Sequence, residues 1–263
     1  MSKQFISEIN NRAGLYVSGK DAQSFLQGLI TNDIELVEEN GLVYSCLLSP
    51  QGKFQHDFFI SITDNGYLID CEGGERVRDL LQKLKVFKLR SDVEFDTFEN
   101  MKVFAGNHDA PDTAYTDPRH KDIGWRDYEI GHDQAEDQKK YDQHRVLLGI
   151  PEGSRDLIPG KSTLIESWLH KLNAVSFKKG CYMGQELTAR MFYRGLAKKH
   201  LYPVTFSSQI FKEGDKIETP EGDMAGEIRS VYQKCGFALI KDKYFEALEG
   251  SRVSPLKLPW MDD

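Results

Sequence analysis

The chain has 263 residues, of which 40% are hydrophobic and 29% charged, and its net charge is −7. This composition is typical of a soluble protein with ample material for a core, and it excludes a surface that is basic throughout. No apolar run approaches the ~20 residues that cross a bilayer, and the first residues lack the apolar core of a signal peptide, so we predict a cytoplasmic protein without a membrane partner.

The first half of the sequence predicts strands and two helices. A strand is expected at 15–17 and an amphipathic helix at 21–30. The β-rich segments 42–48, 54–63 and 67–71 predict a three-stranded meander, joined by turns at Pro50–Gly52 and Asp64–Gly66. Segment 54–63 alternates only partly, so both of its faces are expected to be covered. A second helix at 75–89 and a hairpin of strands 93–98 and 101–105 complete an α+β layer.

The middle of the chain mixes polar loops with helical patterns. We predict a strand at 123–126, a loop or a solvated helix start at 127–140, and a short helix at 141–150. Ser162 is a good N-cap for an amphipathic helix with Leu164, Ile165, Trp168, Leu169 and Leu172 on one face. A short strand is expected at 175–177.

The segment Lys179-Gly180-Cys181-Tyr182 is the densest in chemically capable side chains. The helix predicted for 185–193 places Cys181 just ahead of a helix N-terminus, where the dipole and the neighbouring lysines favour the thiolate. Such a thiolate is a nucleophile, a redox group or a metal ligand. The alternative is a small buried residue in a tight turn.

The region after Gly195 changes pattern to short strands with turn signals. We expect strands at 201–206, 216–219, 224–232 and 236–241, which together suggest a small barrel. The predicted boundary divides the chain into an α+β region, 1–197, and a C-terminal β-barrel, 198–263.

Metal and nucleic-acid sites have little support in the sequence. No Cys-x-x-Cys pair exists among Cys46, Cys71, Cys181 and Cys235, and the seven histidines show no ligand spacing, so no metal site is predicted. A basic run, either a local patch or a solvated helix face, comprises Lys178, Lys179, Arg190, Arg194, Lys198, Lys199 and His200.

The motif Lys-Gly-Cys-Tyr-x-Gly-Gln-Glu at 179–186, followed by Leu-Thr-Ala-Arg and Tyr193-Arg194-Gly195, resembles the signature of the YgfZ family. These are folate-binding, glycine-cleavage T-protein-like proteins linked to iron–sulfur cluster maintenance. The extension is most similar to the alphaproteobacterial and mitochondrial branch, which assists assembly of 4Fe–4S proteins. Further similarity lies at 21–33, at 52–57, at 117–126 and at 145–151.

The resemblance implies an α+β fold with two interleaved regions around a central folate cavity, plus the C-terminal barrel. It implies tetrahydrofolate or a one-carbon derivative as cofactor, with Cys181 as the reactive thiol. The residues it assigns to folate binding are Asp57, Arg145, Lys179, Tyr182, Gln185, Glu186 and Arg190. From the residues alone, Asp57 can equally face outward from its strand, and Arg145 can form a surface ion pair. An inward Asp57 needs donors or a raised pKa.

The expected function is that of a folate-binding accessory protein for iron–sulfur cluster assembly or repair. Its expected partners are iron–sulfur proteins or cluster carriers, without direct nucleic-acid contact, so that support of tRNA modification would be indirect. One alternative is a folate-dependent aminomethyltransferase, which would need Asp57 and not Cys181. The other is a non-catalytic scaffold. Whether the chain is an enzyme stays open.

Overall fold

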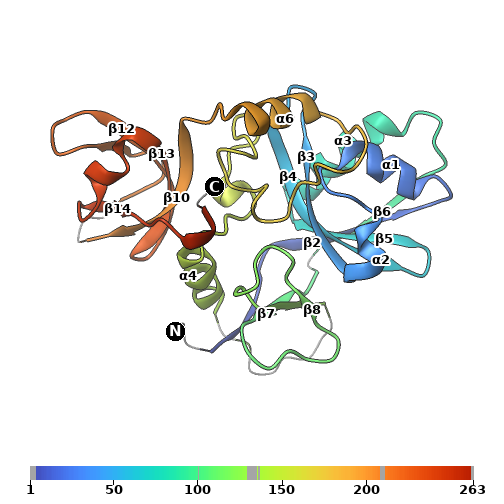
Figure 1. Cartoon of the computed structure of the whole chain (residues 1–263). Helices are drawn as coiled ribbons and strands as arrows, with labels where there is room; N and C mark the ends of the chain where they lie inside the picture. The colour runs from blue at the N-terminus through green and yellow to red at the C-terminus, as the bar shows by residue number, and fades with distance from the viewer. Residues whose placement is uncertain (1–3, 100, 129–134, 136, 208–210, 262–263) are drawn as a thin grey trace.

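Three antiparallel sheets organise the part of the chain that the computed structural model describes, residues 4–99, 101–128, 135, 137–207 and 211–261. In Figure 1 the first sheet lies to the right and the C-terminal sheet to the left. A small third sheet lies below, and helix α6 lies between the first and C-terminal sheets at the top.

The first sheet confirms the predicted meander. Its strand order is β3-β4-β5-β2-β6. The bounds are Arg12–Ser18 for β2, Leu42–Leu48 for β3, Phe54–Thr63 for β4, Gly66–Glu72 for β5 and Glu94–Phe98 for β6.

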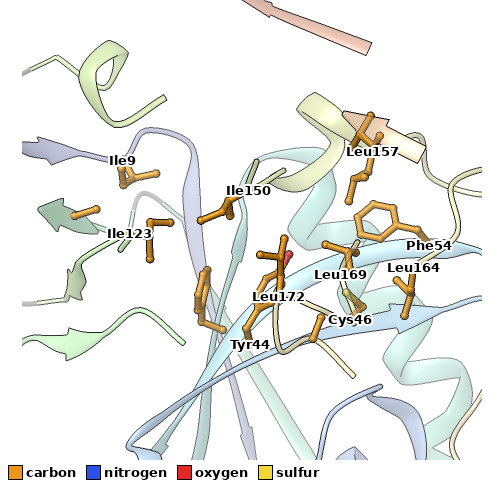
Figure 2. Close-up of a cluster of buried hydrophobic side chains, with 14 of the residues drawn as sticks. Ile9, Tyr44, Cys46, Phe54, Ile123, Ile150, Leu157, Leu164, Leu169 and Leu172 are labelled. Atoms are coloured by element: carbon orange, nitrogen blue, oxygen red, sulfur yellow. The ribbon is translucent and has the colours of Figure 1, made fainter. Parts of the chain in front are cut away.

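Both faces of this sheet are covered, as the partial alternation of β4 predicted. Every residue of β3 is buried. Because successive side chains of a strand point to opposite faces, Tyr44 and Cys46 enter one core while Val43 and Leu47 enter another. Figure 2 shows the first of these cores, in which Tyr44 and Cys46 face residues of the middle segment.

The second core is closed by the two helices expected from the apolar spacing. Helix α1 (Ala22–Leu29) buries Phe25 and Leu26, and α3 (Glu75–Lys88) buries a stripe of Val77, Leu80 and Leu84. A short helix, α2 (Leu36–Asn40), leads into β3. The basic end of α3 suits the negative end of its dipole.

The predicted hairpin at 93–105 is wrong. Strand β6 pairs with β2, whereas the following strand belongs to the third sheet, of order β1-β7-β9-β8. That sheet joins the start of the chain to its middle. Its strands are β1 (Ile6–Glu8), β7 (Phe104–Gly106), β8 (Tyr115–Thr116) and β9 (Trp125–Asp127). The strands expected at 101–105 and 123–126 correspond to β7 and β9, whereas β1 and β8 were not predicted. The partners of all four strands are set by long-range packing.

The middle segment holds α4 (Lys139–Leu147), α5 (Gly153–Asp156) and a run of turns. The helix expected after Ser162 is wrong, because residues 164–173 form successive turns in which Trp168 has φ +60°. That left-handed conformation cannot continue an α-helix. The strand expected at 175–177 is also absent from these described residues. Half of the segment 127–140 lies outside the described residues, and α4 begins near its end, at Lys139.

The C-terminal sheet confirms the predicted short strands and adds one more. Its order is β11-β12-β13-β10-β14, preceded in the chain by α6 (Gln185–Arg194). The strands are β10 (Lys199–Phe206), β11 (Lys216–Glu218), β12 (Met224–Tyr232), β13 (Cys235–Lys241) and β14 (Val253–Pro255), with 3₁₀ turns η1 (Asp242–Tyr244), η2 (Glu246–Leu248) and η3 (Pro259–Met261). In the described residues, no helix is both long and apolar enough to span a membrane.

Candidate functional site

Lys179 anchors the loop that carries Cys181. Its ammonium donates hydrogen bonds to the carbonyl oxygens of Gln27, Ile30 and Asn32, at 2.7, 2.9 and 2.8 Å. These carbonyls lie at the end of α1 and just after it, where helix carbonyls lack intrahelical partners. Burial lowers the pKa of Lys179 to about 8, against a smaller opposing effect of Asp33. All three donors of the ammonium are therefore engaged by the protein itself.

Tyr182 and Gly184 fix the other end of the loop. Tyr182 is buried in the first core, and burial raises its pKa to about 12. Gly184 has φ +79°, and a Cβ there would lie 2.5 Å from the carbonyl oxygen of Ser49. The backbone of Met183 is tied down too, since its N–H donates to the carbonyl of Gly28 at 3.0 Å.

Cys181 is exposed and lies between Lys179 and Tyr182, which are both buried. The other three cysteines, Cys46, Cys71 and Cys235, are buried. The alternative expectation of a small buried residue is therefore wrong. The structure presents one thiol of the four to solvent on a loop that is pinned on both sides.

The helix that follows is as predicted, and it begins four residues after Cys181. Glu186 and Arg190 lie exposed on α6 and form an i,i+4 ion pair of 3.2 Å, while Gln185 is half-buried. These three residues lie near the thiol in sequence but at the surface. Their assignment as folate ligands stays a prediction.

Asp57 lies buried on β4, so the expectation of an outward-facing aspartate is wrong. Its Oδ2 accepts hydrogen bonds from the hydroxyl of Tyr44 at 2.8 Å and from the backbone N–H of Gly153 at 3.1 Å. Burial raises the pKa of Asp57, and these two hydrogen bonds oppose that rise.

Arg145 is fully buried, so the alternative of a surface ion pair is wrong as well. Its guanidinium bonds to Asp142 at 2.9 Å and to Asp156 at 2.6 Å. It also lies 4.8 Å from the ring centroid of Tyr232, whose hydroxyl donates to Asp156. Arg145 thus ties α4 and α5 to β12 of the C-terminal sheet.

A cavity of about 640 Å³ lies beside the Cys181 loop, within the size range of small-molecule sites. One wall is formed by Tyr44 and its neighbours on β3, and another by Ser176, Phe177 and Lys178 just before the anchored loop. The remaining lining residues are Asn32, Leu36, Asn40, Leu42, Val43, Thr116, Pro118, Asn173 and Val175. Asp57 and Arg145 are not on this wall, although Tyr44 connects Asp57 to it.

The residues of this cavity fit a folate. Phe177, which is half-buried, can lie against a flat ring, and the exposed ammonium of Lys178 suits an acidic tail. Strand β3 contributes its edge to this wall, because the side chains of Leu42, Val43 and Tyr44 are buried in the cores. The hydroxyl of Tyr44 donates to Asp57 inside the first core. The amides of Asn32 and Asn173, by contrast, already donate to backbone carbonyls.

A buried ionic network behind the cavity was not singled out from the sequence. Arg119 bonds to Asp117 at 2.6 Å and to Glu152 at 3.0 Å, and it lies over the ring of Phe59. Two more buried arginines, Arg12 and Arg126, both bond to Asp70, at 2.6 and 2.8 Å. The only signal was the Asp-Pro-Arg and Gly-Trp-Arg pattern at 117–126, which gave no partner for either arginine.

The structure thus distributes the predicted site residues over three environments. Asp57 bonds to Gly153 at the start of α5 and Arg145 to Asp156 at its end. Lys179 and Tyr182 hold the loop, and Glu186 and Arg190 are exposed, as is Cys181. Within the described residues, no three His, Cys, Asp or Glu side chains gather as a metal site.

Searches against family models gave no match. Among curated proteins, the chain is 30% identical over 294 residues to the human mitochondrial iron–sulfur cluster assembly factor IBA57, covering 94% of this chain and 82% of that protein. The mouse protein of the same name is 31% identical, over 89% and 77% of the two chains. A homologue from Mycosarcoma maydis is 30% identical over 76% of this chain and 57% of its own length.

The names of these relatives contradict the predicted cytoplasmic location, because all three are called mitochondrial. The prediction depended on the lack of an apolar signal segment. That observation does not separate the cytoplasm from the mitochondrion, since mitochondrial transit peptides are amphipathic rather than apolar.

Among solved structures, the glycine cleavage system aminomethyltransferase T of Bartonella henselae superposes with a TM-score of 0.73 over 99% of this chain and 87% of that one. The sequence identity is 13%, so this likeness shows the fold, and it confirms the expected T-protein-like α+β architecture. Together with the identity to the human protein over most of both chains, it leads to one assignment: this chain belongs to the YgfZ/IBA57 family.

Proposed function

We propose that this protein assists iron–sulfur cluster assembly by offering the thiol of Cys181 to a cluster that a partner protein carries. The observation that supports this is the contrast between the exposed Cys181 and its buried anchors, Lys179 and Tyr182. A thiol held out on a fixed loop is accessible to a macromolecular partner and has little conformational entropy to lose on binding.

The count of thiols supports a shared cluster. Iron–sulfur clusters are held by several cysteine thiolates, typically four, and this chain exposes one. The other three cysteines are enclosed in the cores and cannot reach the same cluster without unfolding. The remaining ligands would therefore come from the partner, which is consistent with relatives named as assembly factors.

The test is cluster delivery to an apo 4Fe–4S enzyme in a mixture with a cluster carrier, comparing wild type with Cys181→Ser. The matched control is Cys235→Ser, since Cys235 is buried and its Sγ donates to the carbonyl of Tyr232, a bond that serine can keep. We expect at least a tenfold loss of rate for Cys181→Ser and near wild-type delivery for the control. Equal rates for all three proteins would refute the role of the thiol.

We further propose that tetrahydrofolate or a one-carbon derivative binds in the cavity beside the loop. The T-protein-like fold and the fit of the lining residues support this. Binding at micromolar affinity corresponds to about −8 kcal/mol and is measurable by anaerobic calorimetry. Asp57→Ala should weaken it at least tenfold and Cys181→Ser should not. No binding by the wild type would remove folate from the proposal and leave the thiol role standing.

A one-carbon transferase is the second candidate, and the environment of Asp57 is the observation that favours it. A buried carboxylate with a raised pKa, linked to the cavity through the Tyr44 hydroxyl, is suited to accept a proton during catalysis. This candidate predicts folate-dependent turnover that is lost in Asp57→Asn and retained in Cys181→Ser, the reverse of the first pattern. Any effect on tRNA modification would be indirect in the first case, through cluster-dependent enzymes.

A further inference from the structure

A second cavity of about 640 Å³ lies on the C-terminal side of α6, where β10 and β13 run side by side. Its walls come from the start of β10 and from the end of β13 with the η1 turn. Four of the lining residues are lysines, namely Lys198, Lys199, Lys241 and Lys243.

Two of these lysines are placed against each other by the sheet itself. Lys199 and Lys241 are direct cross-strand partners in the β10–β13 ladder. Like charges at this position destabilise a sheet. Lys199 is partly compensated by Glu166 at 3.7 Å, and Lys241 donates to the carbonyl of Met224 at 2.7 Å. The ladder therefore tolerates a repulsion that an added anion would relieve.

The two acids on the cavity wall have other hydrogen-bond partners, and Glu166 is also the ion-pair partner of Lys199. Glu166 accepts a hydrogen bond from Thr163 at 2.8 Å, and Asp242 lies 2.8 Å from Nδ1 of His200. Asp242 also accepts from the hydroxyl of Tyr202. The cavity lining carries four lysines and two carboxylates, so its charge is positive although the chain as a whole has a net charge of −7.

An apolar surface adjoins the lysines. Leu196 lies on the cavity wall and is 47% exposed. It follows Phe192 and Tyr193, two exposed aromatic residues at the end of α6 that pack against Phe177 on the side of the first cavity. Exposed aromatic and aliphatic side chains next to a charged rim are typical of protein interfaces.

We propose that this lysine-lined cavity binds an acidic segment of a partner polypeptide, with Asp or Glu side chains at the lysines and an apolar side chain against Leu196. Among the described residues of the wall there is no arginine fork and no glycine-rich turn, the usual features of a phosphate site, so a carboxylate-bearing chain is the better match. The cavity lies beyond the C-terminal end of α6 and Cys181 lies before its N-terminal end. The helix between them has ten residues and is about 15 Å long, a span that one partner can bridge.

That this partner is the cluster carrier rests on the proposed function, whereas binding of an acidic segment does not. The probe is a fluorescein-labelled peptide of alternating Glu and Ser with a central Leu, titrated by fluorescence anisotropy at low salt. The variants are Lys198→Glu/Lys243→Glu and the milder Lys198→Gln/Lys243→Gln, both at exposed positions. The control, Lys85→Glu/Lys121→Glu, makes the same charge change at exposed sites outside the cavity lining.

We expect the double Glu variant to bind the peptide at least about tenfold more weakly, the Gln variant to be intermediate, and the control to lose less than about twofold. Cys181→Ser should bind like wild type, so a failure of the thiol hypothesis leaves this result intact. The proposal is overturned if the cavity variants and the control lose affinity equally. It is also overturned if a single-stranded oligouridylate or inorganic tripolyphosphate binds more tightly than the peptide in a manner that depends on the same lysines.

Discussion

The hydroxyl of Tyr44 donates a 2.8 Å hydrogen bond to Oδ2 of Asp57, so a residue on the cavity wall is coupled to a carboxylate buried behind it. This hydrogen bond connects Asp57 to the cavity wall. The backbone N–H of Gly153, at the start of α5, donates to the same oxygen. Proton transfer or ligand binding that depends on Asp57 is expected to depend on Tyr44 as well.

Replacing Asp57 by asparagine should change how stability depends on pH. Burial raises the pKa of Asp57 above its ordinary value of 3.8, so the native state keeps a proton that the unfolded chain has released. The free energy of unfolding therefore falls as pH rises through this window. Asparagine removes that term and can still accept from Tyr44. In urea unfolding, the free energy of unfolding of the variant should increase relative to that of the wild type as pH rises above about 4. A difference that is constant across pH would contradict this.

Lys179→Met should loosen the Cys181 loop. The substitution leaves three buried carbonyls without their donor, which costs on the order of 2–4 kcal/mol in the free energy of unfolding. We expect faster reaction of Cys46 and Cys71 with a thiol reagent as well, because local opening exposes the core. Lys178→Met, at the exposed neighbouring position, is the control and should match wild type within about 0.5 kcal/mol.

Gly180 and Gly184, the two glycines of the Cys181 loop, should differ sharply in their tolerance of alanine. At Gly184, a Cβ would lie 2.5 Å from a backbone oxygen, at φ +79°, so Gly184→Ala should cost more than about 2 kcal/mol. A Cβ at Gly180 would meet no heavy atom of the described residues within 4 Å, so Gly180→Ala should be nearly neutral. Thermal unfolding of both variants compares them directly, and equal melting temperatures would count against the pinned loop.

Arg145→Met should weaken the attachment of the C-terminal sheet. It would leave the buried Asp156 without its cation, at a cost of about 3–5 kcal/mol, whereas Asp142 keeps its ion pair with Arg155 at 3.0 Å. Tyr232→Phe removes the hydroxyl bond to Asp156 but keeps the ring against the guanidinium, so its cost should be about 1 kcal/mol. Limited proteolysis between α6 and β10 should report the difference, with Arg145→Met cut faster. Similar cleavage of both variants would argue against this account.

Local patterns in the sequence were sufficient for most elements, including the meander, α1, α3, α6 and the strands β10 to β13 of the C-terminal sheet. They failed where a long-range contact decides. Nothing in segment 93–105 indicates that its two strands join different sheets. The apolar spacing at 164–172 suits a helix, yet Trp168 adopts φ +60° and stacks on His200 of β10 at a centroid distance of 4.1 Å. Packing across the two regions overrides the helical pattern there.

The candidate site was predictable in its residue types more than in its geometry. The motif at 179–186 located the loop, but which side chains are buried and which exposed follows from the end of α1, which lies about 150 residues earlier in the chain. Likewise, Asp57 was recognised as a site residue, whereas its contact with Tyr44 depends on the β3–β4 register. Resemblance to a family therefore identified the positions of the site residues, whereas the contacts of these residues could be seen only in the folded chain.

The exposure of Cys181 on the anchored loop also determines how oxidation affects this protein. Cys181 meets oxidants first, because it is the exposed thiol, while the other three cysteines lie inside the cores. A sulfenic acid formed there has no accessible second cysteine within the chain, so it can form a disulfide only with an external thiol, either a small molecule or another protein. Oxidative stress would thus block the proposed cluster contact by a mixed disulfide, which a reductant reverses without refolding.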